Sequence, residues 1–100
     1  MKYSKLDAKD YAREHMKGIW AAALNPFNDD FSFNEDGLRR NIRHWIDDLG
    51  IAGFFIAGKQ GEFFSMSLEE RKQNFEIAVE ETAGKAGTIM SCSDQNFDTV

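Results

Sequence analysis

Residues 51–71 read IAGFFIAGKQGEFFSMSLEER, and this stretch decides the fold class. Its first seven residues form an almost continuous apolar run, which is typical of a buried strand and which ends at Gly58. A short polar turn, Lys-Gln, lies between this glycine and Gly61, and Ser67 then begins an S-x-x-E capping box, a common helix start. A strand that leads through a glycine-flanked turn into a capped helix is one βα unit of an α/β protein. In such units ligands bind where the strands end.

Two other apolar runs predict one strand before this unit and one after it. They are GIWAAAL, residues 18–24, and AGTIMSC, residues 86–92, although the alanines of the first run leave a helix open there. Because polar and apolar residues do not alternate in these runs, both faces of each strand are expected to be buried. The order therefore predicts a parallel sheet covered by helices.

Helices are predicted between these strands and beside them. Asn34 is the expected N-cap of a helix that ends at Gly50, and a short helix is expected within residues 5–17. Asn96 is the expected cap of a last helix. The helix that follows Asn34 has an apolar stripe at helical spacing, made of Leu38, Ile42, Trp45, Ile46 and Leu49. The helix after Ser67 is expected to end at Gly84 and to bury Leu68, Phe75, Ala78, Val79 and Thr82.

The chain has 100 residues, so we expect at most one domain. A parallel sheet of three strands leaves two unpaired edges. We therefore expect residues 18–100 to be the first part of a larger, truncated α/β domain, and residues 1–17 to be an N-terminal extension with a short helix. The alternative is a complete small βαβαβ domain.

Composition narrows the class of protein. The formal net charge of −5 and the scattered basic residues argue against nucleic acid as a partner. No apolar stretch approaches membrane-spanning length, and the single cysteine, Cys92, permits no internal disulfide, so a cytoplasmic protein without a membrane partner is expected. Cys92 is expected to be a buried thiol. His15 and His44 stand alone, so no metal site is expected.

The turn GKQG, residues 58–61, does not fit the common phosphate-binding motifs. A P-loop needs a Gly-Lys pair that leads directly into a helix, and the Rossmann fingerprint needs three glycines in a different spacing. Two glycines around polar residues still allow backbone N–H groups to approach a carboxylate or a phosphate. A plain turn with solvated side chains is the alternative.

Three segments in order resemble the dihydrodipicolinate synthase / N-acetylneuraminate lyase family. They are GIWAAALNPF, GKQGEFFSMSLEER and GKAGTIMSCSDQNFDTV, beside the family patterns G-x-x-x-A-x-x-T-P-F, G-T-T-G-E-x-x-x-L-x-x-E-E-R and a third strand that runs into G-x-x-x-x-x-T. The resemblance implies a (β/α)8 TIM barrel of which this chain forms about the first three βα units. It also implies a class I aldolase that forms a Schiff base with pyruvate or another 2-oxo acid, without a cofactor, and a homo-oligomer when full length. The Schiff-base lysine and the proton-transfer tyrosine are expected beyond Val100, so no catalytic residue is expected within the chain.

The resemblance also implies the substrate-binding residues. Lys59 and Gln60 stand where the family has two threonines, one for a proton relay and one for the substrate carboxylate. Lys59 can hold a carboxylate as a point charge but cannot relay protons as threonine does. Asn25 stands at the threonine before Pro-Phe, and Glu62 is expected to hold the loop. We therefore expect an aldolase, hydratase or dehydratase other than authentic dihydrodipicolinate synthase. The alternatives are a non-enzymatic anion-binding module and a catalytically dead family member.

Overall fold

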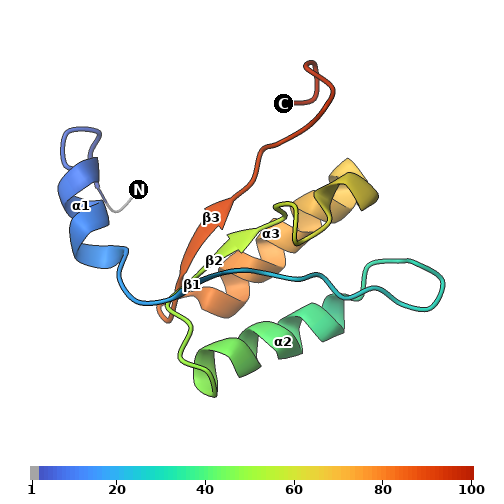
Figure 1. Ribbon diagram of the computed structural model, residues 1–100, viewed down its shortest axis with the longest axis horizontal. Helices are drawn as coiled ribbons and strands as arrows, with labels where there is room; N and C mark the ends of the chain where they lie inside the picture. Colours follow the sequence, from blue (N-terminus) through green and yellow to red (C-terminus); the bar gives the residue numbers. More distant parts are fainter. Residues whose placement is uncertain (1–2) are drawn as a thin grey trace.

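The predicted order of strands and helices is present up to the third strand in the computed structural model, which describes residues 3–100. Three parallel strands lie in the order β1-β2-β3 in one sheet (Figure 1). The elements are α1 (Ala8–His15), β1 (Trp20–Ala22), α2 (Glu35–Asp47), β2 (Gly53–Ile56), the 3-10 helix η1 (Phe63–Ser65), α3 (Leu68–Thr82) and β3 (Gly87–Met90). The alanine-rich run is thus a strand, and η1 is an element that the sequence did not predict.

The core lies between the sheet and the pair of helices α2 and α3. Leu38 and Ile42 of α2, Phe54 and Ile56 of β2 and Ile77 of α3 are each at most 1% exposed. The strand residues between them point to the other face of the sheet, where Phe55 is 37% exposed. On that face the indole of Trp20 lies over the neighbouring strands. A Cβ atom on Gly53 would come within 2.3 Å of that ring, so glycine is required there.

The helix caps predicted at Asn34, Ser67 and Gly50 are confirmed. The Asn34 side chain accepts a hydrogen bond from the Gly37 N–H, and Ser67 forms the complete capping box with Glu70. Gly50 takes a left-handed φ of 67°, as its place after α2 predicts.

The predicted buried side of α3 is only partly correct. Ala78 and Thr82 are buried as expected, but Leu68 and Val79 are 45% and 53% exposed. Asn74 and Ile77 are buried in their place, and all four buried residues fall on one helical stripe. Leu49 at the end of α2 is exposed as well, because the helix ends before it.

Two expectations about the segment after β3 are wrong. Cys92 is exposed rather than buried, because β3 ends before it at Met90. Asn96 begins a hydrogen-bonded turn, in which its carbonyl accepts from the Thr99 N–H, and not a helix. The short helix expected within residues 5–17 is present as α1, while the division of the chain at Gly18 stays a prediction.

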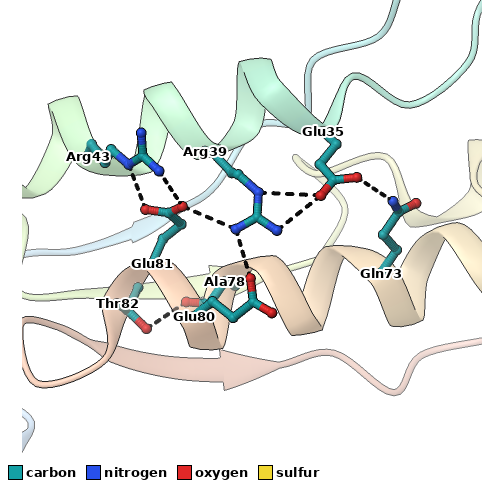
Figure 2. Close-up of polar contacts among 8 residues, drawn as sticks. All are labelled: Glu35, Arg39, Arg43, Gln73, Ala78, Glu80, Glu81 and Thr82. Carbon is teal, nitrogen blue, oxygen red and sulfur yellow. Dashed lines mark hydrogen bonds and ion pairs between the residues drawn. The ribbon is translucent and has the colours of Figure 1, made fainter.

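Charged side chains connect α2 to α3 on the surface of the helical layer (Figure 2). Arg43 donates two hydrogen bonds to the Glu81 carboxylate, at 2.7 and 2.8 Å. Arg39 contacts the same carboxylate at 3.1 Å and also pairs with Glu35 and Glu80. The Arg43 hydrogen bonds, followed by those of Arg39, lower the pKa of Glu81 below its usual value. This network links the two helices from Glu35, the first residue of α2, to Glu81 near the end of α3.

Candidate functional site

The three loops that follow β1, β2 and β3 leave the sheet at the same end, where the carboxyl ends of the strands lie, because the strands are parallel (Figure 1). The loop after β2 begins at Ala57 and contains the Lys59–Gln60 turn. Asn25 follows β1, and Ser93 and Asp94 follow β3. These loops form the carboxyl-terminal mouth of the sheet, the place where parallel α/β folds bind ligands.

The turn after β2 is held in an unusual backbone conformation. The φ angles of Ala57 and Glu62 are 53° and 58°, which is the left-handed region, and neither Gly58 nor Gly61 takes a positive φ. Inside the turn the Glu62 N–H donates to the carbonyl of Lys59 at 3.0 Å. The conformational freedom of glycine is therefore not what shapes this turn.

The two glycines are required by their neighbours. A Cβ atom on Gly58 would lie 2.3 Å from the Phe55 ring, and one on Gly61 would lie 3.0 Å from Asn25 Nδ2 and 3.1 Å from the carbonyl of Ala23. Side chains at either place would displace the loop. The glycines thus allow the turn to lie directly against the ends of β1 and β2.

Lys59 and Gln60 are exposed on this turn. Within residues 3–100 their side chains have no hydrogen-bond or ion-pair partner, and Lys59 does not pair with Glu62 three residues away. Glu62 contributes its backbone N–H instead. An unengaged ammonium group beside an amide and backbone N–H donors is suited to bind an anion such as a carboxylate.

Asn25 is buried at the base of the turn. Its Nδ2 donates to the Gly61 carbonyl at 2.6 Å, and its Oδ1 accepts from Nδ2 of Asn74 at 2.6 Å. Its amide therefore supports the turn from below. A direct contact of Asn25 with a substrate stays a prediction. The partner on α3, Asn74, was missed, because a buried asparagine in a helix has no local sequence signal.

A second polar contact joins α3 to the segment after β3. Arg71 donates to the Asp94 carboxylate at 2.8 Å and to the Ser93 carbonyl at 3.1 Å. The N–H of Asn96 and then Arg71 lower the pKa of Asp94. A small cavity of about 150 Å³ lies beside this pair. It is lined by Phe63, Phe64, Met66, Arg71, Asp94 and Gln95.

The two histidines of the chain lie on α2 and α1. His44 lies on α2 and faces Asp48 at 2.6 Å, away from the mouth, and His15 accompanies Tyr11 on α1. Among residues 3–100 no group of three His, Cys, Asp or Glu side chains is arranged to hold a metal ion. In the same part of the chain, no helix combines the length and apolar character needed to cross a membrane.

Comparisons with known proteins agree with this geometry. The model of the dihydrodipicolinate synthetase family matches residues 15–97. N-acetylneuraminate lyase from Fusobacterium nucleatum is 41% identical over 83 residues, which are 83% of this chain and 29% of the relative. The lyase of the same name from Clostridium perfringens is 43% identical over 82 residues, 82% of this chain and 28% of the relative. The chain thus spans less than a third of the length of these relatives.

Solved structures show the same similarity in three dimensions. A Clostridium difficile protein in complex with mannosamine superposes with a TM-score of 0.79 at 38% identity, over 84% of this chain and 29% of that one. N-acetylneuraminate lyase from Fusobacterium nucleatum superposes with the same TM-score at 40% identity, over 85% of this chain and 29% of that one. These neighbours are TIM-barrel enzymes, which confirms the prediction that the three parallel strands are a portion of a (β/α)8 barrel.

Proposed function

Because this chain belongs to the dihydrodipicolinate synthetase family, we propose that it is the first part of a lyase that forms a Schiff base with pyruvate or another 2-oxo acid. The relatives are named N-acetylneuraminate lyases, which favours the aldolase form of this chemistry over a hydratase or dehydratase. The observation that carries the proposal is the position of the Lys59–Gln60 turn at the mouth, where neither side chain has a partner among residues 3–100.

The reaction needs groups of two kinds. A lysine amine condenses with the 2-oxo carbon and releases water, and the resulting imine accepts the electron pair when the neighbouring carbon–carbon bond breaks. We place that lysine, and the tyrosine that moves protons, beyond Val100. The described residues would bind the substrate. Lys59 would hold its carboxylate by charge, and Gln60 would donate through its amide.

The two side chains also limit which reaction is proposed. Lys59 and Gln60 have no hydroxyl group, so they cannot pass a proton along a chain of hydroxyls as two threonines can. We therefore propose a substrate other than that of dihydrodipicolinate synthase. We further propose that the complete protein is a cytoplasmic homo-oligomer; the single cysteine of the present chain fits the reducing compartment in this proposal.

The test uses the protein encoded by the full reading frame. Incubation with pyruvate and borohydride should attach one reduced pyruvate to a single lysine beyond Val100, and borohydride alone should attach none. Lys59→Met should still be labelled, but its KM for the 2-oxo acid should rise about tenfold or more, because a charged hydrogen bond is worth about 1.5–3 kcal/mol. Lys85→Met, at the other end of the sheet, is the matched control and should behave as wild type.

The same experiment separates the main alternative. If no lysine is labelled, the aldolase proposal is wrong. Titration of pyruvate or phosphate by calorimetry would then distinguish a binding protein, in which binding depends on Lys59, from a protein whose turn binds nothing. A non-enzymatic anion-binding module is kept as the second candidate because the exposed Lys59 ammonium on this turn can hold an anion without any catalytic group.

A further inference from the structure

Two buried asparagine side chains connect α3 to the carboxyl ends of β1 and β2. Asn74 donates through Nδ2 to Asn25 Oδ1 at 2.6 Å, and Asn25 donates through its own Nδ2 to the Gly61 carbonyl at 2.6 Å. Asn74 has no exposed surface and Asn25 is 9% exposed. The sulfur of Met66 lies 3.5 Å from Asn25 Nδ2 and 3.9 Å from Asn74 Nδ2. The link is thus enclosed and excludes water from both amides.

This link ends beside residues of the turn that have a strained backbone conformation. Ala57 and Glu62, on either side of the turn, both take left-handed φ angles. Residues with a Cβ atom keep this conformation only where the surrounding structure fixes it. The hydrogen bond from Asn25 to the Gly61 carbonyl fixes the backbone immediately before Glu62. The asparagine link therefore acts where the turn is strained.

Stability alone does not explain an asparagine at position 74. Its Oδ1 is buried, and within residues 3–100 it has no hydrogen-bond partner. Burial of this unpaired carbonyl oxygen lowers stability and offsets part of what the residue gains through its hydrogen bond. The Nδ2 group, in contrast, makes the short hydrogen bond to Asn25. The role of the Asn74 amide is therefore to hold the side chain of Asn25.

We infer that Asn74 is a positioning residue for the Lys59–Gln60 turn. It holds the side chain of Asn25, Asn25 holds the Gly61 carbonyl, and the direction in which Lys59 and Gln60 face the mouth is thereby fixed. Asn74 does not touch the substrate. The inference rests on the proposed function only in that the turn is taken to bind the carboxylate of a 2-oxo acid.

The variant Asn74→Leu, made in the protein encoded by the full reading frame, removes the donor and keeps a side chain branched at the same carbon. Thr82→Val is the matched control. Thr82 is a buried polar residue of the same helix, 3% exposed, and its hydroxyl donates to the Ala78 carbonyl at 2.7 Å (Figure 2). Each variant loses one buried hydrogen bond, but only the first loses a link to the turn. Should Asn74→Leu fail to fold, Asn74→Ala and Thr82→Ala form the equivalent pair without added volume.

Hydrogen exchange gives the first readout. The amides of Glu62 and Phe63, which close the turn on the carbonyls of Lys59 and Gly58, should exchange about tenfold faster in Asn74→Leu, as loss of roughly one hydrogen bond predicts. They should exchange at the wild-type rate in Thr82→Val. Equal exchange in wild type and Asn74→Leu, or equal acceleration in both variants, would overturn the positioning role.

Kinetics gives the second readout. The KM for the 2-oxo acid should rise about tenfold in Asn74→Leu with kcat changed less than about twofold, because a misplaced turn weakens substrate binding and leaves the lysine chemistry in place. Thr82→Val should leave both constants unchanged. Exchange is measured without substrate, so it decides the positioning role even if wild type traps no 2-oxo acid. The two proposals can therefore fail separately.

Discussion

Replacement of Glu81 by glutamine should weaken the contact between α2 and α3 by about 1–2 kcal/mol at neutral pH. The Glu81 side chain is 11% exposed and accepts two hydrogen bonds from Arg43 and one from Arg39. A buried hydrogen bond to a charged group contributes about 1.5–3 kcal/mol, and an exposed ion pair about 0–1 kcal/mol. Arg43 is 57% exposed, so solvent screens its share, while Arg39 keeps two other carboxylate partners. The estimate therefore lies between the two limits.

The pH dependence of this effect has a definite sign. The arginines lower the pKa of Glu81 in the folded protein below that of the unfolded chain, first through Arg43 and then through Arg39. The stabilisation is therefore complete above the unfolded pKa, about 4.3, and is lost as the pH falls through the lower folded pKa. Wild type and Glu81→Gln should differ in unfolding free energy at pH 7 and converge in acid.

Urea denaturation at a series of pH values measures this difference. Glu69→Gln is the matched control on the same helix, because Glu69 pairs with Lys72 at 3.4 Å and is 82% exposed. It should change the unfolding free energy by less than about 0.5 kcal/mol. If both variants shift the midpoint equally, or if the Glu81→Gln difference does not shrink as the pH is lowered into the acid range, the reasoning is refuted.

Three further substitutions test the local structure, each by the same denaturation assay. Ser67→Ala should cost about 1 kcal/mol, because the capping box at the start of α3 is lost. Gly53→Ala should cost about 1–3 kcal/mol, because the new Cβ meets the Trp20 ring at 2.3 Å, and Trp20→Ala in the same chain should recover part of that loss. Gly50→Ala should cost about 1 kcal/mol for its left-handed φ alone, since no atom lies within 4 Å of the new Cβ.

The sequence was sufficient to predict the three strands and the helices α1, α2 and α3, because their signals are local. The caps at Asn34 and Ser67 depend on partners three residues away, and Gly50 depends on its own φ. Apolar runs predict strands for the same reason. The buried side of α3 was harder, because Leu68 and Val79 are apolar yet exposed. Hydrophobicity places a residue correctly only when the facing element is known.

The sequence predicted the location of the candidate site but not the residues that hold its loops in place. The exposed turn at Lys59 follows from the strand, the glycines and the capping box around it. The partners of the supporting residues are distant in sequence, since Asn25 and Asn74 are 49 residues apart and Arg71 and Asp94 are 23 apart. No periodicity or spacing can report such contacts, because they depend on how the helix packs against the strand ends.

The structure also explains how the turn can carry side chains that differ from the family pattern. Its shape is set by residues around it: the ring of Phe55 against Gly58, the amide of Asn25 on the Gly61 carbonyl, and the backbone contact of Glu62. Lys59 takes part only through its carbonyl oxygen. Because these contacts do not involve the side chains at positions 59 and 60, those side chains can be substituted while the turn keeps its conformation. If the turn binds the substrate as proposed, substrate preference can therefore change by substitution at these two positions while the surrounding strands and loops stay the same.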